Sequence, residues 1–491
     1  MEGAQTHSQT LSSRFLKVFL LNLFLSLWLV PAWAEVKVPG LKVVLIRELE
    51  DVSFYARAGH FPDAFLSFSP EEKYLAVGTF LGRLLLLETE TGNLVWEKKF
   101  PEAMVKRVRF SRDGKTLYVG EQSPDGFIYA FDIETKRELW RFRLADDLLS
   151  GEPPEKGDVY GIYRQPGCYR LLVLPDGDLL VLGIHSWFDR KKKGWRRLSR
   201  LWRLTPRGDV RWAWPARGPA PLTLIYADTD QKARLIGLVS TIPSDEVPED
   251  YPLSPGTFYL LDAQTGKERW RYVIPPLKPY FDRVSVWEYV ALSPNGQWAL
   301  VGTSDGRAIF FNLEMRQVAK VLPLGAPVLI GDLPVSAHVS YGLFSPRGEA
   351  LVVTGSSNIP YGMPLVVNRP AGPHPQANTL FALRPPGQIL WRFGIDFRFQ
   401  GLTTDEGGNW LAVAAGAARK GLEKNHQFGV FLFDLRKGTF YTYYPTEGPC
   451  FFHLALSPQG RFLAVVETPY LSEQETLHGH YRLHLLEIQL D

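Results

Sequence analysis

The stretch FLSFSPEEKYLAVGTFLGRLLLLETETGNLVWEKKF, residues 65–100, holds the pattern that decides the fold of this chain. Short apolar runs alternate in it with SPEEK, TFLG and TETGN, which are rich in residues typical of tight turns. Each run has the length and the side chains of a β-strand. The stretch therefore predicts consecutive antiparallel strands joined by short hairpins.

The same unit returns along the chain. Its first hairpin recurs as VRFSRDGKTLYVGE from Val108, YRLLVLPDGDLLVLGI from Tyr169, YVALSPNGQWALVGT from Tyr289, YGLFSPRGEALVVTG from Tyr341 and FHLALSPQGRFLAVVE from Phe452, with weaker copies from Leu222 and Phe399. A repeated unit of four strands is the signature of a β-propeller. The sequence predicts an all-β protein, a single eight-bladed propeller with four antiparallel strands per blade. Seven blades are the alternative if one weak copy is an insertion.

The expected domain runs over residues 35–491, with blades at about 65–100, 108–144, 169–215, 222–275, 289–324, 341–397, 399–446 and 452–491. The last blade supplies only three strands. The early strand LKVVLIREL, within residues 41–50, has no partners of its own and is predicted to complete that blade. Such closure removes the exposed sheet edges that favour aggregation.

The N-terminus has the pattern of an export signal. Arg14 and Lys17 precede an apolar run at 18–30, and the small-residue pattern AWA follows at 32–34. A run of about 13 residues falls short of the roughly 20 that span a bilayer, which argues against the alternative of a retained anchor. We expect a signal peptide over 1–34, cleavage after Ala34, a periplasmic or secreted product, and no transmembrane segment after cleavage.

Charge and cysteine content do not identify a partner or a disulfide. The 55 Lys and Arg nearly balance the 52 Asp and Glu, and the net charge of +3 does not indicate a nucleic-acid partner. Cys168 and Cys450 are the only cysteines, and each precedes an equivalent repeat strand. A disulfide is possible in an exported chain, but equivalent positions on non-adjacent blades should lie too far apart for a bond. The pairing stays open.

The fourth strands carry the resemblance to a known family. They read TGNLVW (91–96), TKRELW (135–140), TGKERW (265–270) and PGQILW (386–391), with the looser RGDVRW ending at Trp212. These resemble the repeat of pyrroloquinoline-quinone (PQQ) enzymes and their non-catalytic relatives, the quinoprotein-like propellers, while the first hairpins resemble WD40-type repeats. The identical place of Trp96, Trp140, Trp212, Trp270 and Trp391 favours a structural role in blade-to-blade packing over a ligand platform.

The resemblance does not identify a reaction for this chain. PQQ enzymes carry an adjacent cysteine pair and a calcium site, and this chain has no adjacent cysteines, so no catalytic residue can be carried over and no PQQ or other cofactor is expected. The motifs CxxCH, GxSxG and HExxH are also absent. We therefore expect a non-catalytic, monomeric propeller that binds a protein partner. The alternative is an enzyme, of the PQQ-like oxidoreductase, lyase or lactonase type, with a site at the channel mouth.

All the long insertions fall on one predicted face. Between the second and third strands of blades they occupy 186–200, 241–256, 357–378, 416–427 and 468–480, and between blades they occupy 150–167, 276–288 and 325–340. Loops of this length in a compact domain usually bind something or are disordered. This face is where the partner, or the alternative enzyme's substrate, is expected.

The insertion SWFDRKKKGWRRLSR, residues 186–200, interleaves cations with aromatic rings. The candidate partner-binding residues are Trp187, Phe188, Trp195, Arg196 and Arg197 from this insertion, with Tyr251 and Tyr361 from neighbouring ones. Such a mixture can also bind bases or polyanions, but export argues against nucleic acid. The neighbouring insertion carries SDEVPEDYP at 244–252, so the alternative is that the two oppositely charged segments simply pair with each other.

Four histidines fall on the same face. His374, His426, His478 and His480 come from different insertions, and imidazoles from several loops can form a transition-metal site, with Glu473 or Glu475 as a further ligand. The alternative is that they are ordinary surface residues.

Overall fold

A computed structural model describes residues 38–50, 65–155, 158–282, 284, 286–360, 371–396, 398–416, 428–471 and 476–489. The chain divides into two units, Met1–Pro39 and Gly40–Asp491, and every element described below lies in the second. The predicted signal peptide and its cleavage site at Ala34 fall on residues outside those described.

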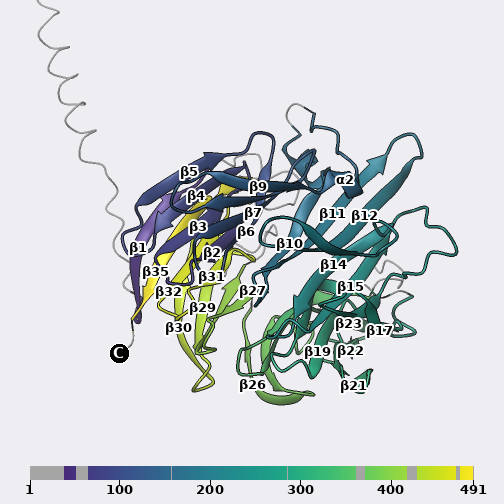
Figure 1. Ribbon diagram of the computed structural model, residues 1–491. Helices are drawn as coiled ribbons and strands as arrows, with labels where there is room; N and C mark the ends of the chain where they lie inside the picture. The colour runs from purple at the N-terminus through teal and green to yellow at the C-terminus, as the bar shows by residue number, and fades with distance from the viewer. Residues whose placement is uncertain are drawn as a thin grey trace, which may run out of the picture. The chain divides into compact units, whose positions relative to one another are not determined.

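The second unit is built of antiparallel sheets, mostly of four strands each, as Figure 1 shows. The first three groups of strands are β2 (Phe65–Phe68), β3 (Tyr74–Gly78), β4 (Arg83–Glu88) and β5 (Leu94–Lys99); β6 (Met104–Phe110), β7 (Thr116–Gln122), β8 (Phe127–Asp132) and β9 (Glu138–Arg143); and β10 (Gly167–Val173), β11 (Leu179–Asp189), β12 (Gly194–Leu204) and β13 (Val210–Trp214). The second and third groups join into one sheet through a single pair, Gly167 with Gln122.

The remaining groups follow the same order along the chain. They are β14 (Leu222–Thr229), β15 (Leu235–Pro243), β16 (Thr257–Asp262) and β17 (Glu268–Val273); β18 (Val286–Leu292), β19 (Trp298–Thr303), β20 (Ala308–Asn312) and β21 (Gln317–Leu322); β22 (Val328–Ile330), β23 (Leu333–Phe344), β24 (Ala350–Asn358), β25 (Thr379–Arg384) and β26 (Gln388–Gly394); and β27 (Phe399–Thr404), β28 (Trp410–Ala415), β29 (Gly429–Asp434) and β30 (Thr439–Pro445). The prediction of an all-β protein is confirmed.

The last sheet joins the two ends of the unit. It has the order β1-β35-β32-β31, formed by β1 (Leu41–Glu48), β31 (Leu454–Leu456), β32 (Phe462–Glu467) and β35 (Arg482–Ile488). β1 pairs antiparallel with β35 from Leu41 opposite Ile488 to Glu48 opposite Arg482. This confirms the prediction that the early strand completes the last repeat, and it gives β35 a partner on each side.

Hydrogen bonds from a serine fix the turn of the first hairpin in several copies. The Oγ of Ser69, Ser111, Ser293 and Ser457 accepts a hydrogen bond from the backbone N–H five residues later, at distances of 3.0, 2.9, 2.9 and 2.8 Å respectively. In the turn that begins at Ser293, Gly296 has φ of +71°, a value that favours glycine. In each of these copies the serine that begins the turn therefore also closes it by a hydrogen bond.

The two weak copies use aspartate for the same purpose. The Oδ1 of Asp230 accepts from the N–H of Leu235 at 2.9 Å, and the Oδ1 of Asp405 accepts from the N–H of Trp410 at 2.6 Å. Each of these copies forms its own four-stranded sheet, β14–β17 and β27–β30. They look degenerate in sequence because a different side chain makes the same hydrogen bond.

The sheets pack face to face through their middle strands. β3 and β4 are almost entirely buried, whereas the outer strand β5 alternates between exposed and half-buried residues. Ala76, Leu84 and Leu86 of this sheet form one hydrophobic cluster with Val119 and Phe131 of the next. Strands that are buried on both faces explain why the central runs are continuously apolar rather than alternating.

The five repeat tryptophans all lie half-buried on outer strands and contact the following sheet. The contacts are ring pairs of Trp96 with Phe131 at 5.4 Å, Trp270 with Phe311 at 5.6 Å and Trp391 with Phe433 at 5.6 Å, and hydrogen bonds from the Nε1 of Trp140 to Pro206 O at 2.9 Å and of Trp212 to Ala263 O at 3.1 Å. Each ring thus links one sheet to the next.

The innermost strands touch one another in a closed circuit. β2 contacts β6, and the contacts continue through β10, β14, β18, β23, β27 and β31 back to β2. These strands therefore form a continuous series of contacts. The described residues form no helix long and apolar enough to cross a membrane.

Three segments expected as loops contain strands instead. Residues 186–200 continue the β11–β12 hairpin, and residues 325–340 contain β22 and most of β23. Residues 468–480 contain β33 (Tyr470–Leu471) and β34 (Leu477–His478). Residues 150–167 contain a 3-10 helix, Val159–Arg164, shortly after the short helix α2, Ala145–Leu148. The expectation was wrong because the strands of a hairpin can extend beyond the repeat. Where they do, their residues include cations and aromatics and lack the apolar pattern of a buried strand.

Candidate functional site

The inserted hairpin β11–β12 carries most of the predicted partner-binding residues, and its two strands are long and continuously paired. Its strands pair without interruption from Leu179 opposite Leu204 to Asp189 opposite Gly194. In this register Trp187 lies opposite Arg196, and Phe188 lies opposite Trp195. Because successive side chains alternate between the two faces of a strand, these two pairs point in opposite directions.

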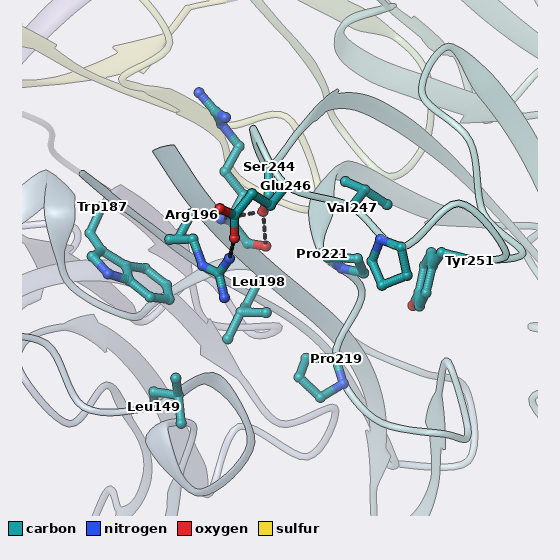
Figure 2. Close-up of a pocket in the computed structure, with 12 residues that line it drawn as sticks. Leu149, Trp187, Arg196, Leu198, Pro219, Pro221, Ser244, Glu246, Val247 and Tyr251 are labelled. Atoms are coloured by element: carbon teal, nitrogen blue, oxygen red, sulfur yellow. Dashed lines mark hydrogen bonds and ion pairs between the residues drawn. The ribbon is translucent and has the colours of Figure 1, made fainter. Parts of the chain in front are cut away.

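A hollow of about 540 Å³ lies on the face that carries Trp187 and Arg196. Figure 2 shows Trp187 and Leu149 on one side of it and Val247 and Tyr251 on the other, with Leu198 between them. Its remaining wall includes Pro219, Pro221 and Pro248. The hollow is thus mainly apolar and aromatic, with two arginines and one glutamate at its edge, which is a composition typical of ligand and peptide sites.

The structure brings four of the predicted partner-binding residues, Trp187, Arg196, Arg197 and Tyr251, to this hollow. Phe188 and Trp195 lie on the other face of the hairpin, where their rings contact edge to face at 5.9 Å and are 43% and 39% exposed. Tyr361 lies outside the described residues.

Trp187 is held in place from behind by His185. The two rings stack with centroids 4.2 Å apart. The Nδ1 of His185 lies 2.8 Å from Leu148 O, and its Nε2 lies 3.1 Å from Arg164 O. Burial lowers the pKa of His185 below its ordinary value, although these carbonyls partly offset the shift. The indole is therefore fixed against a buried ring whose own position is set by the connection before β10.

The charged segments around the hollow pair with each other. Glu246 forms ion pairs with Lys192 at 3.0 Å and with Arg196 at 2.9 Å, and the backbone N–H of Trp195 donates to Asp245 at 2.7 Å. The pairing predicted as the alternative for these two insertions therefore occurs. These pairs orient the arginines at the rim, and exposed pairs of this kind contribute little to stability.

Arg197 and Tyr251 are both half-buried at the hollow. Arg197 donates to Pro243 O at 2.6 Å, and burial lowers the pKa of its guanidinium, partly offset by Asp245. Burial also raises the pKa of Tyr251. Both side chains carry hydrogen-bonding groups at the hollow.

Three of the lining residues could not be predicted from the sequence. Leu149 follows α2 with φ of +67° and is 55% exposed, while Pro219 and Pro221 precede β14. They come from connections between sheets, and no pattern in those connections relates them to the inserted hairpin. Only the packing of neighbouring sheets brings them to one place.

The histidines predicted as metal ligands have other contacts. His374 is buried, with Nε2 3.0 Å from Ala326 O, and His478 stacks on Tyr470. His480 lies between Glu48 at 2.9 Å and Glu447 at 3.4 Å. His426 lies outside the described residues, and within those described no group of three His, Cys, Asp or Glu side chains is placed to hold a metal ion.

The two cysteines are free and buried. Cys168 lies against Gly120 of the preceding repeat, and the Sγ of Cys450 lies 3.3 Å from the Oγ1 of Thr446. Burial raises the pKa of both thiols, for Cys168 to about 12. Both therefore stay protonated and unreactive at neutral pH.

Comparison with known proteins agrees with this architecture. Residues 66–150 match the family model described as outer membrane protein assembly factor BamB. The structure described as "Structure of Dos1 propeller" aligns with a TM-score of 0.53 at 12% identity, over 92% of this chain and 96% of that one. The crystal structure of BamB from Moraxella catarrhalis aligns with a TM-score of 0.46 at 13% identity, over 91% and 99%.

Curated relatives match over a shorter stretch. Echinoderm microtubule-associated protein-like 2 is 38% identical over 80 residues in Mus musculus and 40% identical over 73 residues in Homo sapiens. The aligned stretch amounts to 16% of this chain and 12% of the mouse protein, and to 15% and 11% for the human one.

At such low identity the full-length structural match defines the fold, which is that of a β-propeller. Residues 66–150 of this propeller are in addition similar to the family model described as outer membrane protein assembly factor BamB.

Proposed function

We propose that this chain is an exported, non-catalytic propeller that binds a protein partner through the hollow on the β11–β12 hairpin. The observation that carries the proposal is the placing of Trp187 and Tyr251 at opposite sides of one mainly apolar hollow. Aromatic and arginine side chains around an apolar centre are the residues that dominate binding energy in protein interfaces.

The shape and chemistry of the hollow favour an extended segment with apolar side chains. Pro219, Pro221 and Pro248 give it rigid walls that lose little conformational freedom when a partner binds. Arg196 and Arg197 at the rim can donate to backbone carbonyls or to a carboxylate of the partner. The hollow is large enough for a few side chains, so the rest of the partner would lie on the surrounding insertions.

The relatives support a binding role in the cell envelope. The matching family model is described as an assembly factor for outer membrane proteins, and a role of that class fits a chain whose N-terminus has the pattern of an export signal. The whole activity of that factor is not carried over, because the match covers residues 66–150 only.

The proposal includes one ring of eight blades. It is supported by the closed circuit of innermost strands, by the separate sheets formed at the two weak repeats, and by the completion of the last sheet by β1. A monomeric ring needs no second copy to cover a sheet edge.

Affinity capture from the native envelope fraction tests the proposal. The bait is the full chain, compared with a Trp187→Ala/Tyr251→Ala double variant. A matched control carries Leu139→Ala and Val210→Ala on outer strands, where the side chains are 54% and 49% exposed and lie outside the hollow. We expect one stoichiometric partner with the wild type and the control, and its loss with the double variant. Equal capture by all three baits would contradict the proposed site.

A further inference from the structure

Three arginines and two tyrosines converge where the innermost strands meet. Arg107 and Arg109 lie on β6, Arg170 on β10, Tyr226 on β14 and Tyr341 on β23. The guanidinium of Arg170 lies 4.2 Å from the ring centroid of Tyr226, and the Oη atoms of Tyr226 and Tyr341 are 3.4 Å apart. We call these five residues the axial cluster, and none of them lines the hollow.

The positive charge of the axial cluster is only partly balanced. Arg170 pairs with Asp228 at 3.4 Å and donates to Ala227 O at 2.8 Å, while the second oxygen of Asp228 accepts from the N–H of Leu292 at 2.9 Å. The carboxylate is thus already engaged by Arg170 and the backbone.

Arg109 is the least compensated member. Its Nη1 donates to Val108 O at 2.8 Å, and among the described residues it has no carboxylate partner. Burial and the charges of Arg170 and Arg107 lower the pKa of its guanidinium to about 10, and the groups that oppose this shift are the hydroxyls of Tyr226 and Tyr341. A half-buried cation beside two others is unfavourable unless an anion accompanies it.

Other arginines with largely buried side chains in this protein are paired differently. Each lies against a carboxylate: Arg203 with Asp178 at 2.7 Å, Arg307 with Asp305 at 2.6 Å and Arg482 with Glu447 at 3.2 Å. At these three places a carboxylate balances a buried arginine, whereas the described hydrogen bond of Arg109 goes to a backbone carbonyl.

We propose that the axial cluster binds an oxyanion, a phosphate or a carboxylate group, between the guanidinium groups of Arg109 and Arg170 and the hydroxyls of Tyr226 and Tyr341. Guanidinium and phenol groups are donors that match either oxyanion, and charge-assisted hydrogen bonds to them are strong. Arg107, which stacks at 4.3 Å over Phe65 and donates to Tyr169 O at 2.9 Å, adds positive potential from the neighbouring position. The aromatic rings of Phe65 and Phe452 lie beside the cluster, against Arg107 and Tyr341 respectively.

Titration calorimetry and thermal unfolding of the full chain test this site. The probes are inorganic phosphate and succinate, each compared with sodium chloride at equal ionic strength. We expect binding of at least one probe and a rise in the unfolding temperature that chloride does not produce. Binding of phosphate alone assigns a phosphate ligand, and binding of succinate alone assigns a carboxylate. The same unfolding temperature in all three salts would overturn the proposal.

The Arg109→Gln variant separates a binding role from a structural one. It removes a like charge, so without oxyanion it should unfold at the wild-type temperature or above, while its affinity for the probe falls about tenfold or more. Arg109→Lys should recover part of the affinity, and Arg207→Gln, at an exposed residue between β12 and β13, should leave it unchanged. Retention of full affinity by Arg109→Gln would overturn the assignment, and a lower unfolding temperature in chloride would show that Arg109 is structural.

Discussion

The repeat hairpins and the inserted β11–β12 hairpin use the same backbone geometry for opposite purposes. In the repeat, Ser293 closes its turn by a local hydrogen bond, and the following strand is buried. In the insertion, the strands extend past the sheet and present Trp187 and Arg196 to a hollow. The comparison teaches that the frame, by which we mean the repeated sheets, is built from local interactions that recur in each copy. The site occurs once and is formed by segments that are distant in sequence and come together only when the chain folds.

The largest difference between the repeat sheets and the hollow is expected in how much their ion pairs contribute to stability. Glu467 in the closing sheet is fully buried and forms ion pairs with Arg482 and with His484 at 3.3 Å, whereas Glu246 at the hollow is exposed. We expect Glu467→Gln to lower the free energy of unfolding at pH 7 by about 3 to 5 kcal/mol, because Arg482 loses its buried counter-charge. Glu246→Gln should change it by less than about 1 kcal/mol. Urea unfolding of both variants measures the difference.

The effect of Glu467→Gln should also depend on pH. Burial alone would raise the pKa of Glu467, but the hydrogen bond from His484 and the charges of His484 and Arg482 lower it below its ordinary value. The stabilisation by the carboxylate is thus complete above pH 4.5 and is lost as the pH falls below it. Wild type and variant should converge in stability between pH 7 and pH 3. A difference that stays constant would show that the pair contributes by packing rather than by charge.

The tryptophans offer a second contrast. Trp270 lies between sheets against Phe311, so Trp270→Ala should cost about 3 kcal/mol by leaving a cavity, near the lower end for buried aromatics because the ring is half-buried. Trp187→Ala should cost about 1 kcal/mol, since it removes chiefly the stacking on His185. Thermal unfolding followed by circular dichroism compares them. Equal costs would mean that the hollow belongs to the frame.

A buried carboxyl of the frame should respond to pH in the opposite sense. Burial raises the pKa of Glu121 in β7 to about 7, against partial compensation by Ser123. Since the folded state favours the neutral acid, stability falls as the pH rises from about 4.5 through 7. We expect Glu121→Gln to stabilise the protein by about 1 to 3 kcal/mol at pH 8 and by little at pH 5. The exposed Glu134→Gln is the control, and a stabilisation independent of pH would contradict the assignment.

The smallest effect is expected for the exposed pair at the rim of the hollow. A double-mutant cycle on Arg196 and Glu246, each changed to Ala, should give a coupling of about 0.2 to 1 kcal/mol that falls in high salt. The measurement uses urea unfolding at two salt concentrations. A coupling above about 2 kcal/mol would place this pair with the buried pairs of the frame.

The frame could be predicted from sequence because its signals are local and repeated. The serine turns and the fourth-strand tryptophans recur at fixed places, and the unpaired strand at residues 41–49 has one position left to fill. The copies from Leu222 and Phe399 were recognised as weaker because Asp230 and Asp405 stand where most of the other copies have serine. Trp187, Arg196, Arg197 and Tyr251 of the site were predicted because they lie in long insertions that carry cations and aromatic rings.

The rest of the site could not be predicted, for physical reasons. Phe188 and Trp195 face away from Trp187 because residues 186–200 are strands with alternating sides, not a loop. Leu149 and Pro219 reach the hollow through packing between sheets. The axial arginines occupy ordinary strand positions, and only contacts between the innermost strands bring Arg170 of β10 to Tyr226 of β14.

Site-specific photocrosslinking tests most directly the claim that the hollow binds a partner. A benzophenone amino acid replaces Trp187 in one chain and Leu139, on the outer strand β9, in another, and both are irradiated in the native envelope fraction. The account predicts one discrete adduct of defined mass from position 187 and none from position 139. Adducts from position 139 alone, or none from either position, would contradict it.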